Sequence, residues 1–423
     1  MNGAGRAATG ERRRFALLVA AYALGVFNDN LFRQTAIFLA VAAGRTELRG
    51  VAAALYALPF VALAAPAGWL ADRFPKGGVA GAAKAAEIGI VLLGGAGMVT
   101  GNWWLILAMM FLMGLQSAVF SPALNGLLPA VFPPAAVVRV NAWMRIAVTA
   151  AILAGTLGSG YALSLDLGGA GGGAAAGRWQ AAGLLLAVAA AGFLASLPAP
   201  RRPAAAPGLR FPWAGPAETW RAVCGLRTDR LLAWVVAADV WIWFAGAVQL
   251  LAVVTLGTQE LGVGEAMTSN LLFGTLVGTA AGGWLSTRWL AGPGWQHRRL
   301  PWVLAAQGAL LLAMPAAVQP ALPAGWRLGL AAGVLFLLGV GCGLVMIPCE
   351  SFVQVRPPAA AKGRVLAAAN ALIFTGILLA GVLVTVADRY TGLPASVQLA
   401  VLGAVQFPVL LRLRRRLAAA GGG

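Results

Sequence analysis

Long apolar runs, separated by short polar connections, follow one another along the whole 423-residue chain. A helix needs about 20 predominantly apolar residues to cross a lipid bilayer. The composition agrees with a lipid environment, since only 10% of the residues are charged, against roughly 25% in a soluble domain. The sequence therefore predicts an all-α membrane protein with twelve transmembrane helices, at 15–41, 51–71, 78–99, 103–124, 137–163, 179–197, 230–256, 267–290, 301–320, 327–349, 363–387 and 394–411.

The basic residues of the connections are distributed unevenly between the two sides of the membrane. If the predicted helices alternate in direction, one side holds most of them and the other holds only Arg45, Arg49, Arg178, Arg327 and Arg389. Loops enriched in Lys and Arg are the cytoplasmic ones. We therefore expect both termini in the cytoplasm. Topology and anionic lipid headgroups then account for the net charge of +18, and no nucleic-acid partner is expected.

The two halves of the chain echo one another on either side of a Pro- and Arg-rich segment. The second predicted helix of each half ends in Gly-Trp-Leu, at 68–70 and at 283–285. Pro-Pro, Asn-Ala and Ala-Gly steps then recur in the same order in both halves. We expect an N-terminal six-helix bundle at 1–197, a basic cytoplasmic linker at 198–229 and a C-terminal six-helix bundle at 230–423.

A repeat of two six-helix bundles resembles the fold of the major facilitator superfamily, and so does the loop motif at 68–76. The resemblance implies a substrate site near the membrane midplane between the halves. It also implies that the loop motif closes one face of the protein. In that role Gly68 would permit close helix approach, and Asp72 would accept hydrogen bonds from a helix N-terminus. Arg73 and Lys76 would meet the lipid headgroups.

An acid, a base and three amides interrupt the first apolar run, between residues 25 and 34. A charged side chain at this depth costs about 2.5–3.5 kcal/mol, so it is usually retained for a function. At 3.6 residues per turn, Tyr22, Asp29 and Arg33 share one face of the helix, and Asn30 lies on its flank. Two interpretations remain open. Either this face binds a ligand, or Asp29 and Arg33 only neutralise each other across one turn.

A second polar stripe lies in the seventh predicted helix, where Asp239 and Trp243 share a face and Gln249 lies at its edge. For Asp239, solvation at the cytoplasmic end of the helix is the alternative explanation. Gln116 in the fourth helix is a weaker binding candidate. Lys84 and Glu87, three residues apart in the third helix, are expected to be a structural pair.

A closer resemblance, to the lysophospholipid transporters of the same superfamily, is carried by the segments 27–33, 121–129, 138–142, 241–247 and 363–370. It implies movement of lysophospholipids between leaflets of the bacterial inner membrane, with Arg33 facing the phosphate and Asp29 the ammonium. Reacylation would then require a separate acyltransferase. The chain departs from this branch at Ala142, which replaces a glycine, and at Arg145, where an acid is common.

No enzymatic, metal or cofactor site is expected. Acyltransferases related to this branch use a His four residues ahead of an Asp, whereas the sole histidine, His297, lies in a basic loop. The three cysteines show no paired spacing that would suggest a metal site or a disulfide framework. One alternative function is a proton-coupled exporter of drugs or small solutes, with Asp29 or Asp239 as the protonated carboxylate. A membrane scaffold or sensor without transport is another.

Overall fold

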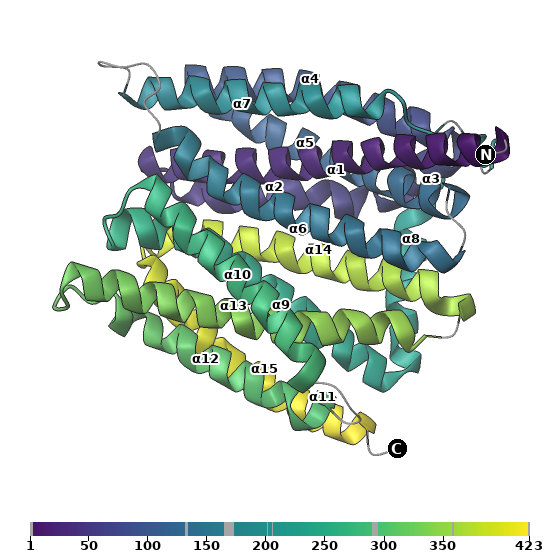
Figure 1. The fold of residues 1–423 in the computed structure, drawn as a ribbon. Helices are drawn as coiled ribbons and strands as arrows, with labels where there is room; N and C mark the ends of the chain where they lie inside the picture. The colour runs from purple at the N-terminus through teal and green to yellow at the C-terminus, as the bar shows by residue number, and fades with distance from the viewer. Residues whose placement is uncertain are drawn as a thin grey trace. The chain divides into compact units, whose positions relative to one another are not determined.

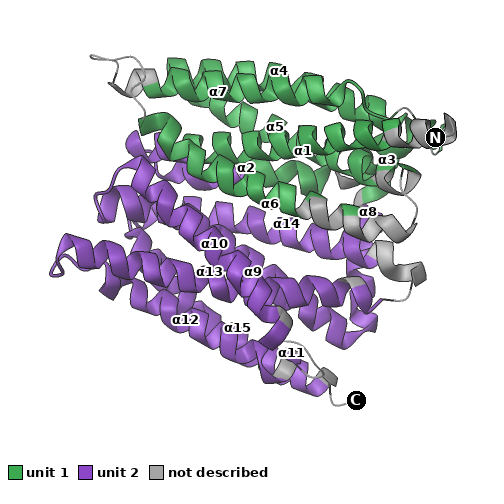
Figure 2. Cartoon of the chain, viewed as in Figure 1, with its two compact units in different colours: residues 1–36, 55–216 green, residues 37–54, 217–423 purple. Residues whose placement is uncertain are grey.

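All regular secondary structure in the described part of the chain is helical, as the sequence predicts. The computed structural model describes residues 3–131, 134–164, 173–200, 202–204, 206–289, 295–357 and 359–421. By its internal contacts the chain divides into two compact units (Figure 2). Unit 1 contains residues 1–36 and 55–216, and unit 2 contains residues 37–54 and 217–423.

Unit 1 is built from the helices of the first half of the chain. They are α1 (Gly3–Ala42), α2 (Glu47–Ala62), α3 (Ala64–Arg73), α4 (Lys76–Thr100), α5 (Trp103–Val131), α6 (Pro134–Ser164) and α7 (Gly173–Ser196) (Figure 1). The adjoining ends of α1 and α2 belong to unit 2. Within unit 1, α4 packs against both α5 and α7. The apolar core of unit 1 includes Phe15, Leu18, Phe120 and Leu124, all of which are buried.

Unit 2 holds the helices of the second half. They are α8 (Gly215–Gly225), which begins in unit 1, η1 (Leu226–Thr228), α9 (Arg230–Thr255), the π-helical turn η2 (Leu256–Glu260), α10 (Glu265–Trp289), α11 (Trp295–Arg298), α12 (Leu300–Ala317), α13 (Ala324–Val355), α14 (Ala359–Tyr390) and α15 (Ala395–Gly421). The main pairings are α10 with α13, α12 with α15, and α9 with α14.

Helices α10 and α13 approach closely because glycines on each helix face the backbone of the other. A Cβ atom added to Gly282 would overlap the carbonyl of Val340, and one added to Gly343 would overlap the carbonyl of Thr279. Small residues of this kind let two helix backbones come close where lipid supplies no hydrophobic driving force. The pair is therefore packed as membrane helices are.

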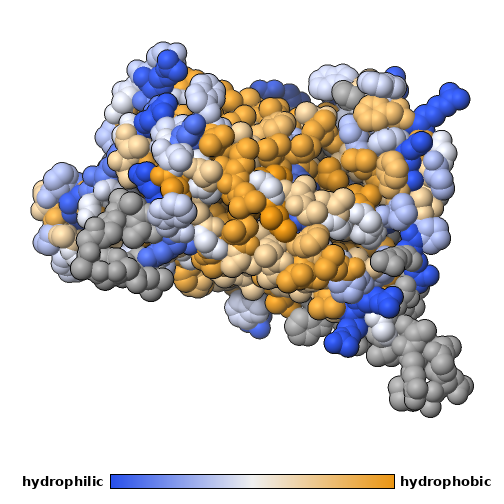
Figure 3. Space-filling view, turned by 90° about the horizontal axis from the view of Figure 1, so that it is seen from above, coloured by the Kyte–Doolittle hydropathy of each residue, from blue (hydrophilic) through white to orange (hydrophobic). Residues whose placement is uncertain are grey.

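Ten described helices are long and apolar enough to cross a membrane, or eleven if α2 and α3 form one span bent by 56°. The predicted span at 51–71 is thus broken near Leu63. The remaining predicted span corresponds to α10, which has 25 residues but is rich in Gly, Ser and Thr. In Figure 3, apolar side chains cover the middle of the visible face and hydrophilic ones gather toward its ends.

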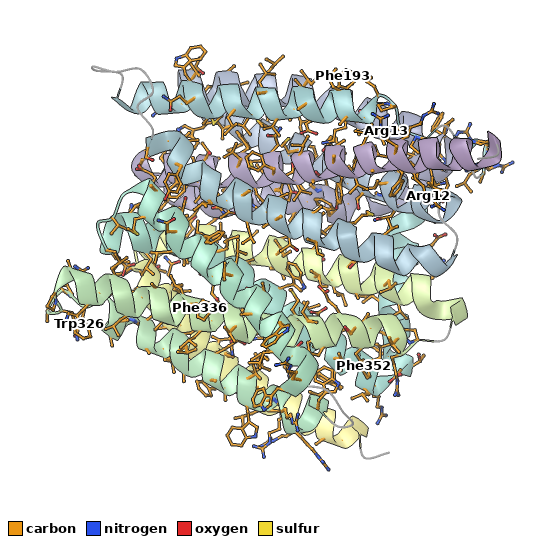
Figure 4. The ribbon with its side chains drawn as sticks, viewed as in Figure 1. Arg12, Arg13, Phe193, Trp326, Phe336 and Phe352 are labelled. Atoms are coloured by element: carbon orange, nitrogen blue, oxygen red, sulfur yellow. The ribbon has the colours of Figure 1, made fainter. Side chains whose placement is uncertain are left out.

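Exposed apolar side chains lie along these helices, as expected where the surroundings are lipid. Leu92 is 54% exposed and Leu194 is 63% exposed. Tryptophans near helix ends are exposed as well, among them Trp104 at 83% and Trp326 at 68%. Trp326 lies near the start of α13 (Figure 4). Tryptophan is enriched at this level because its ring is amphipathic and suits the headgroup region.

Candidate functional site

Asp29 on α1 is the centre of a buried polar site in unit 1. Asp29 is only 6% exposed. Its Oδ2 atom accepts hydrogen bonds from Tyr56 Oη at 3.0 Å and from Ser117 Oγ at 2.6 Å. Tyr56 comes from α2 and Ser117 from α5, so three helices meet at this carboxylate. Hydroxyl donors orient the carboxylate without neutralising its charge.

Arg33 lies one turn beyond Asp29, but its guanidinium has other partners. Its Nη2 donates to Asn30 Oδ1, and Asn30 Nδ2 in turn donates to the carbonyl of Val26 at 2.7 Å. The guanidinium carbon lies 5.3 Å from the centre of the Tyr56 ring, within the range of a cation–π contact. The Nε atom is buried and has no partner among the described residues. The two charges are therefore arranged around Tyr56 rather than paired with each other.

A second buried charge cluster lies next to this site. Lys84 and Glu87 on α4 are each 1% exposed, and their charged groups are 2.6 Å apart. Glu87 also accepts from Asn28 Nδ2 at 3.2 Å and from Gln116 Nε2 at 3.3 Å. Asn28 Nδ2 reaches the carbonyl of Leu185 on α7 as well, at 3.0 Å. The pair expected from spacing is present. It links α4 to α1 and α5, and Asn28 extends the link to α7.

Tyr22 and Gln116 lie where these two clusters adjoin. Tyr22 stacks on Phe120, with ring centres 5.6 Å apart. Both rings, together with Lys84, Gln116 and Ser117, line a cavity of about 10 Å³, which has room for roughly one water molecule. The predicted face of Tyr22, Asp29 and Arg33 thus lies beside Gln116 in the interior of unit 1.

Asp239, Trp243 and Gln249 lie in unit 2 along α9. Asp239 and Gln249 are each 2% exposed. One oxygen of Asp239, both amide atoms of Gln249 and the indole nitrogen of Trp243 are buried without a described partner. Asp239 is also close enough to Glu350 for the two acids to repel each other. With so little exposure, interfacial solvation does not explain this carboxylate.

The loop motif at 68–76 contacts the linker between the halves. Trp69 Nε1 and Arg73 Nη1 both donate to the carbonyl of Leu209, at 3.0 and 2.7 Å. Asp72 pairs with Lys76 at 3.2 Å across one turn, and its side chain is 54% exposed. No described atom lies within 4 Å of a Cβ added to Gly68. The Lys76 side chain that pairs with Asp72 belongs to the first residue of α4.

Arg49 is a buried group that the sequence placed in an outer connection. It is fully buried in unit 2, with Asp388 accepting from Nε and Nη2 at 2.7 Å each. The remaining guanidinium hydrogens reach Leu251 O and Thr255 Oγ1 at 2.7 Å, and Gln398 Oε1 at 3.1 Å. All five donors of the guanidinium are thereby satisfied. These hydrogen bonds hold the start of α2 against the other helices of unit 2, and Arg49 is therefore an anchor within the unit.

Four residues of these clusters were missed or undervalued by sequence reasoning. Tyr56 and Ser117 lie in ordinary apolar context, so nothing in the sequence marks them. Lys84 and Glu87 were recognisable as charges inside an apolar run. The side chains of Arg145 and His297 lie outside the described residues.

No curated protein matches the sequence significantly. Several solved structures, however, share its fold. A crystal structure of a D-xylose-proton symporter has a TM-score of 0.71 at 11% identity, with 96% of each chain covered. A bacterial homologue of the iron transporter ferroportin in an inward-facing state has a TM-score of 0.68 at 14% identity, with 97% of this chain and 99% of that chain covered. At these identities the likeness shows a shared fold.

A third similar structure is a bacterial homologue of the human lysosomal transporter Spinster. Its TM-score is 0.64 at 14% identity, with 97% of this chain and 93% of that chain covered. The family profile of the Major Facilitator Superfamily matches residues 15–381. Because this match extends over both halves of the sequence, the chain belongs to the major facilitator superfamily of membrane transporters.

Proposed function

We propose that this transporter moves lysophospholipids between the leaflets of the bacterial inner membrane by alternating access. The observation that carries the proposal is the arrangement of Asp29 and Arg33 around Tyr56. Among the described residues the carboxylate accepts from hydroxyls only, and the guanidinium keeps a buried nitrogen without a described partner. A zwitterionic headgroup offers one anion and one cation, so its phosphate would meet Arg33 and its ammonium Asp29.

The cargo also suits the energetics of a membrane site. The headgroup alone needs a polar path, because the acyl chain gains about 0.8 kcal/mol for each CH₂ kept from water. The resemblance of segments 27–33, 121–129 and 241–247 to lysophospholipid transporters supports the same cargo. Asn30, Tyr22, Gln116, Asp239, Trp243 and Gln249 complete the proposed substrate site, and Gly68, Asp72, Arg73 and Lys76 the proposed gate. A separate acyltransferase would act on the delivered lipid.

Asp239 favours a second candidate function, the proton-coupled export of drugs or small solutes. A buried carboxyl with an unpartnered oxygen and an acidic neighbour is the kind of group that carries a proton. The D-xylose-proton symporter found among similar structures shares only the fold with this chain. The lysophospholipid proposal is preferred because the exporter gives no role to Arg33.

Reconstitution distinguishes the two functions. Purified protein is placed in liposomes that carry fluorescent lysophosphatidylethanolamine in the outer leaflet, and the extractable fraction is followed with albumin. We expect a protein-dependent loss of extractable lysolipid. Liposomes without protein and liposomes with the Asp29→Asn variant are the controls. An unchanged extractable fraction, together with efflux of a soluble dye or drug, would reject the lysophospholipid proposal in favour of the exporter.

A further inference from the structure

Asp29 and the Lys84–Glu87 pair are joined by a continuous series of side-chain contacts. Ser117 Oγ lies 2.6 Å from Asp29 Oδ2 and 3.2 Å from Gln116 Oε1. Gln116 Nε2 in turn donates to Glu87 Oε2 at 3.3 Å, the same oxygen that accepts from Lys84 at 2.6 Å. The series therefore runs from the candidate substrate site to a buried ion pair on another helix.

Ser117 is the branch point of this series. Its hydroxyl carries one proton but lies within hydrogen-bonding distance of two acceptors, Asp29 Oδ2 and Gln116 Oε1. A charged carboxylate attracts the proton more strongly than an amide oxygen does. When a cationic group neutralises Asp29, that advantage falls and the amide competes for the proton. Whether Ser117 donates to Asp29 or to Gln116 thus depends on whether a cationic group is bound to Asp29.

Gln116 is held in the orientation that this branch requires. Its Nε2 donates to Glu87, so its Oε1 is turned toward Ser117. Glu87 is itself fixed by Lys84 and by Asn28 Nδ2. A buried ion pair contributes little net stability, because desolvation offsets the attraction between the charges. The pair therefore has a role beyond stability: Lys84 holds Glu87 in place as the acceptor for Gln116.

The fold also makes room for Lys84 at this place. A Cβ atom at Gly25 on α1 would overlap the Lys84 ammonium. The ammonium lies 5.3 Å from the centre of the Phe120 ring, and it lines the same small cavity as Ser117 and Gln116. Helix α1 thus accommodates this lysine with a glycine on the turn before Asp29.

We propose that Ser117, Gln116, Glu87 and Lys84 are positioning residues for Asp29, which orient its carboxylate for the cationic group of the substrate and respond when that group binds. Only the identity of that group rests on the proposed function. Asp29 makes the contact with that cationic group. Ser117, Glu87 and Lys84 act through Asp29, and so does Gln116, which also borders the proposed substrate site. Arg33 and Tyr56 complete the ionisable groups around Asp29.

The first test needs no substrate. The infrared band of the Asp29 carboxyl group is identified in purified protein by its loss in Asp29→Asn. We expect this band to shift in Ser117→Ala and also in the double variant Lys84→Met with Glu87→Gln, whose link to Asp29 runs through Gln116 and Ser117. If the double variant does not fold, Gln116→Leu breaks the same series and leaves both charges in place. An unmoved band in the variants that fold would overturn the proposal.

Ser159→Ala is the matched control for this measurement. Ser159 is also fully buried, and its hydroxyl donates to the carbonyl of Thr156 in the same helix, at 2.7 Å. We expect no shift of the Asp29 band in this variant. A shift as large as that in Ser117→Ala would show that the band responds to any loss of a buried hydroxyl, and would reject the assignment.

The second test compares two headgroups. For lysophosphatidylethanolamine, which carries a cation, Ser117→Ala should raise the half-saturating concentration about tenfold, as for a lost hydrogen bond to a charged group. For lysophosphatidylglycerol, which carries no cation, the half-saturating concentration should stay unchanged in Ser117→Ala. Ser117→Thr keeps the hydroxyl and should restore the native value for lysophosphatidylethanolamine. Equal losses for both headgroups would overturn the positioning role. If the native protein moves neither lipid, the proposed function fails, and the infrared result still decides the positioning role.

Discussion

Asp29 and Arg33 are spaced for a direct ion pair, yet Asp29 accepts its hydrogen bonds from Tyr56 and Ser117, and Arg33 donates to Asn30. Their spacing alone therefore did not decide between ligand binding and mutual neutralisation. In the structure Tyr56 donates to the Asp29 carboxylate, and the Arg33 guanidinium carbon lies 5.3 Å from the centre of the Tyr56 ring. This arrangement is the basis for the proposal that both charges bind a third group.

A double-mutant cycle on these two residues tests that reading. Asp29→Asn alone removes the acid one turn from the partly buried Arg33, and transport should fall. The double variant Asp29→Asn with Arg33→Gln removes both charges, and neutral replacement of two opposite charges in the protein interior is often tolerated by the fold. We expect it to be folded and to have lost lysolipid movement. Transport, expression and thermal unfolding are measured for all four proteins. Wild-type transport by the double variant would show that the two charges only compensate each other.

At the scale of single residues, the sequence predicted the acids and bases of the site but not their partners. Helical periodicity was enough to place Tyr22, Asp29 and Arg33 on one face. Tyr56 and Ser117 come from α2 and α5, and only the packing of those helices brings their hydroxyls to Asp29. A single tyrosine or serine in an apolar run has no pattern that distinguishes it.

At the scale of helices, the twelve predicted segments all correspond to helix, but most helices extend beyond them. Helix α13 continues to Val355, past the predicted end at 349, and α1 begins at Gly3 instead of 15. Apolar length measures only the part of a helix in hydrocarbon, and a helix can continue into the headgroup region and beyond. The break between α2 and α3 was missed because both pieces are apolar.

The contact between α10 and α13 gives a prediction at this scale. Gly343→Ala would press a methyl group against the carbonyl of Thr279, so the helices must separate and lose packing. We expect a loss of about 1–3 kcal/mol, as for overpacking of a close contact. Gly333→Ala on the same helix is the control, since no described atom lies within 4 Å of the added Cβ. Thermal unfolding in detergent measures both. Equal stability of the two variants would contradict the close packing.

The start of α9 gives a prediction for pH. Asp229 accepts from Arg356 Nε at 2.8 Å and from Leu232 N at 3.1 Å. Burial works against ionisation, but the hydrogen bond from Arg356 and the helix N–H groups outweigh it, and the pKa of Asp229 is lowered. The stabilisation is therefore complete above the ordinary aspartate pKa of about 4. It is lost as the pH falls through the lower pKa of the folded state.

Asp229→Asn isolates this effect, because asparagine keeps a good N-cap and removes only the charge. Since the pair is partly exposed, with side chains 46% and 32% accessible, we expect a loss of at most about 1 kcal/mol. The difference in melting temperature between the native protein and the variant should be constant from about pH 7 to 5 and should shrink in acid. A difference that grows in acid would contradict the lowered pKa.

At the scale of the molecule, the division of the chain differs in one segment from a simple cut at the linker. Residues 37–54, which connect α1 and α2, are grouped with the helices of the second half. Sequence repeats show which segments of the two halves correspond to each other. They do not show which helices the adjoining ends of α1 and α2 pack against. Arg49 illustrates this limit, because the sequence placed it only in a connection outside the predicted spans, whereas in the structure its guanidinium is fully buried.

The Arg49 cluster gives the last prediction. Arg49→Met would leave Asp388, whose side chain is 3% exposed, as a buried carboxylate without a cation, at a cost of about 3–5 kcal/mol. Arg49→Met with Asp388→Asn removes the stranded charge and should recover much of that loss. Arg45→Met is the matched control on the same connection, since Arg45 lies 3.8 Å from Glu47 and its side chain is 48% exposed. Its loss should stay below about 1 kcal/mol. If thermal unfolding shows equal losses for Arg49→Met and Arg45→Met, Arg49 does not anchor residues 37–54 in unit 2.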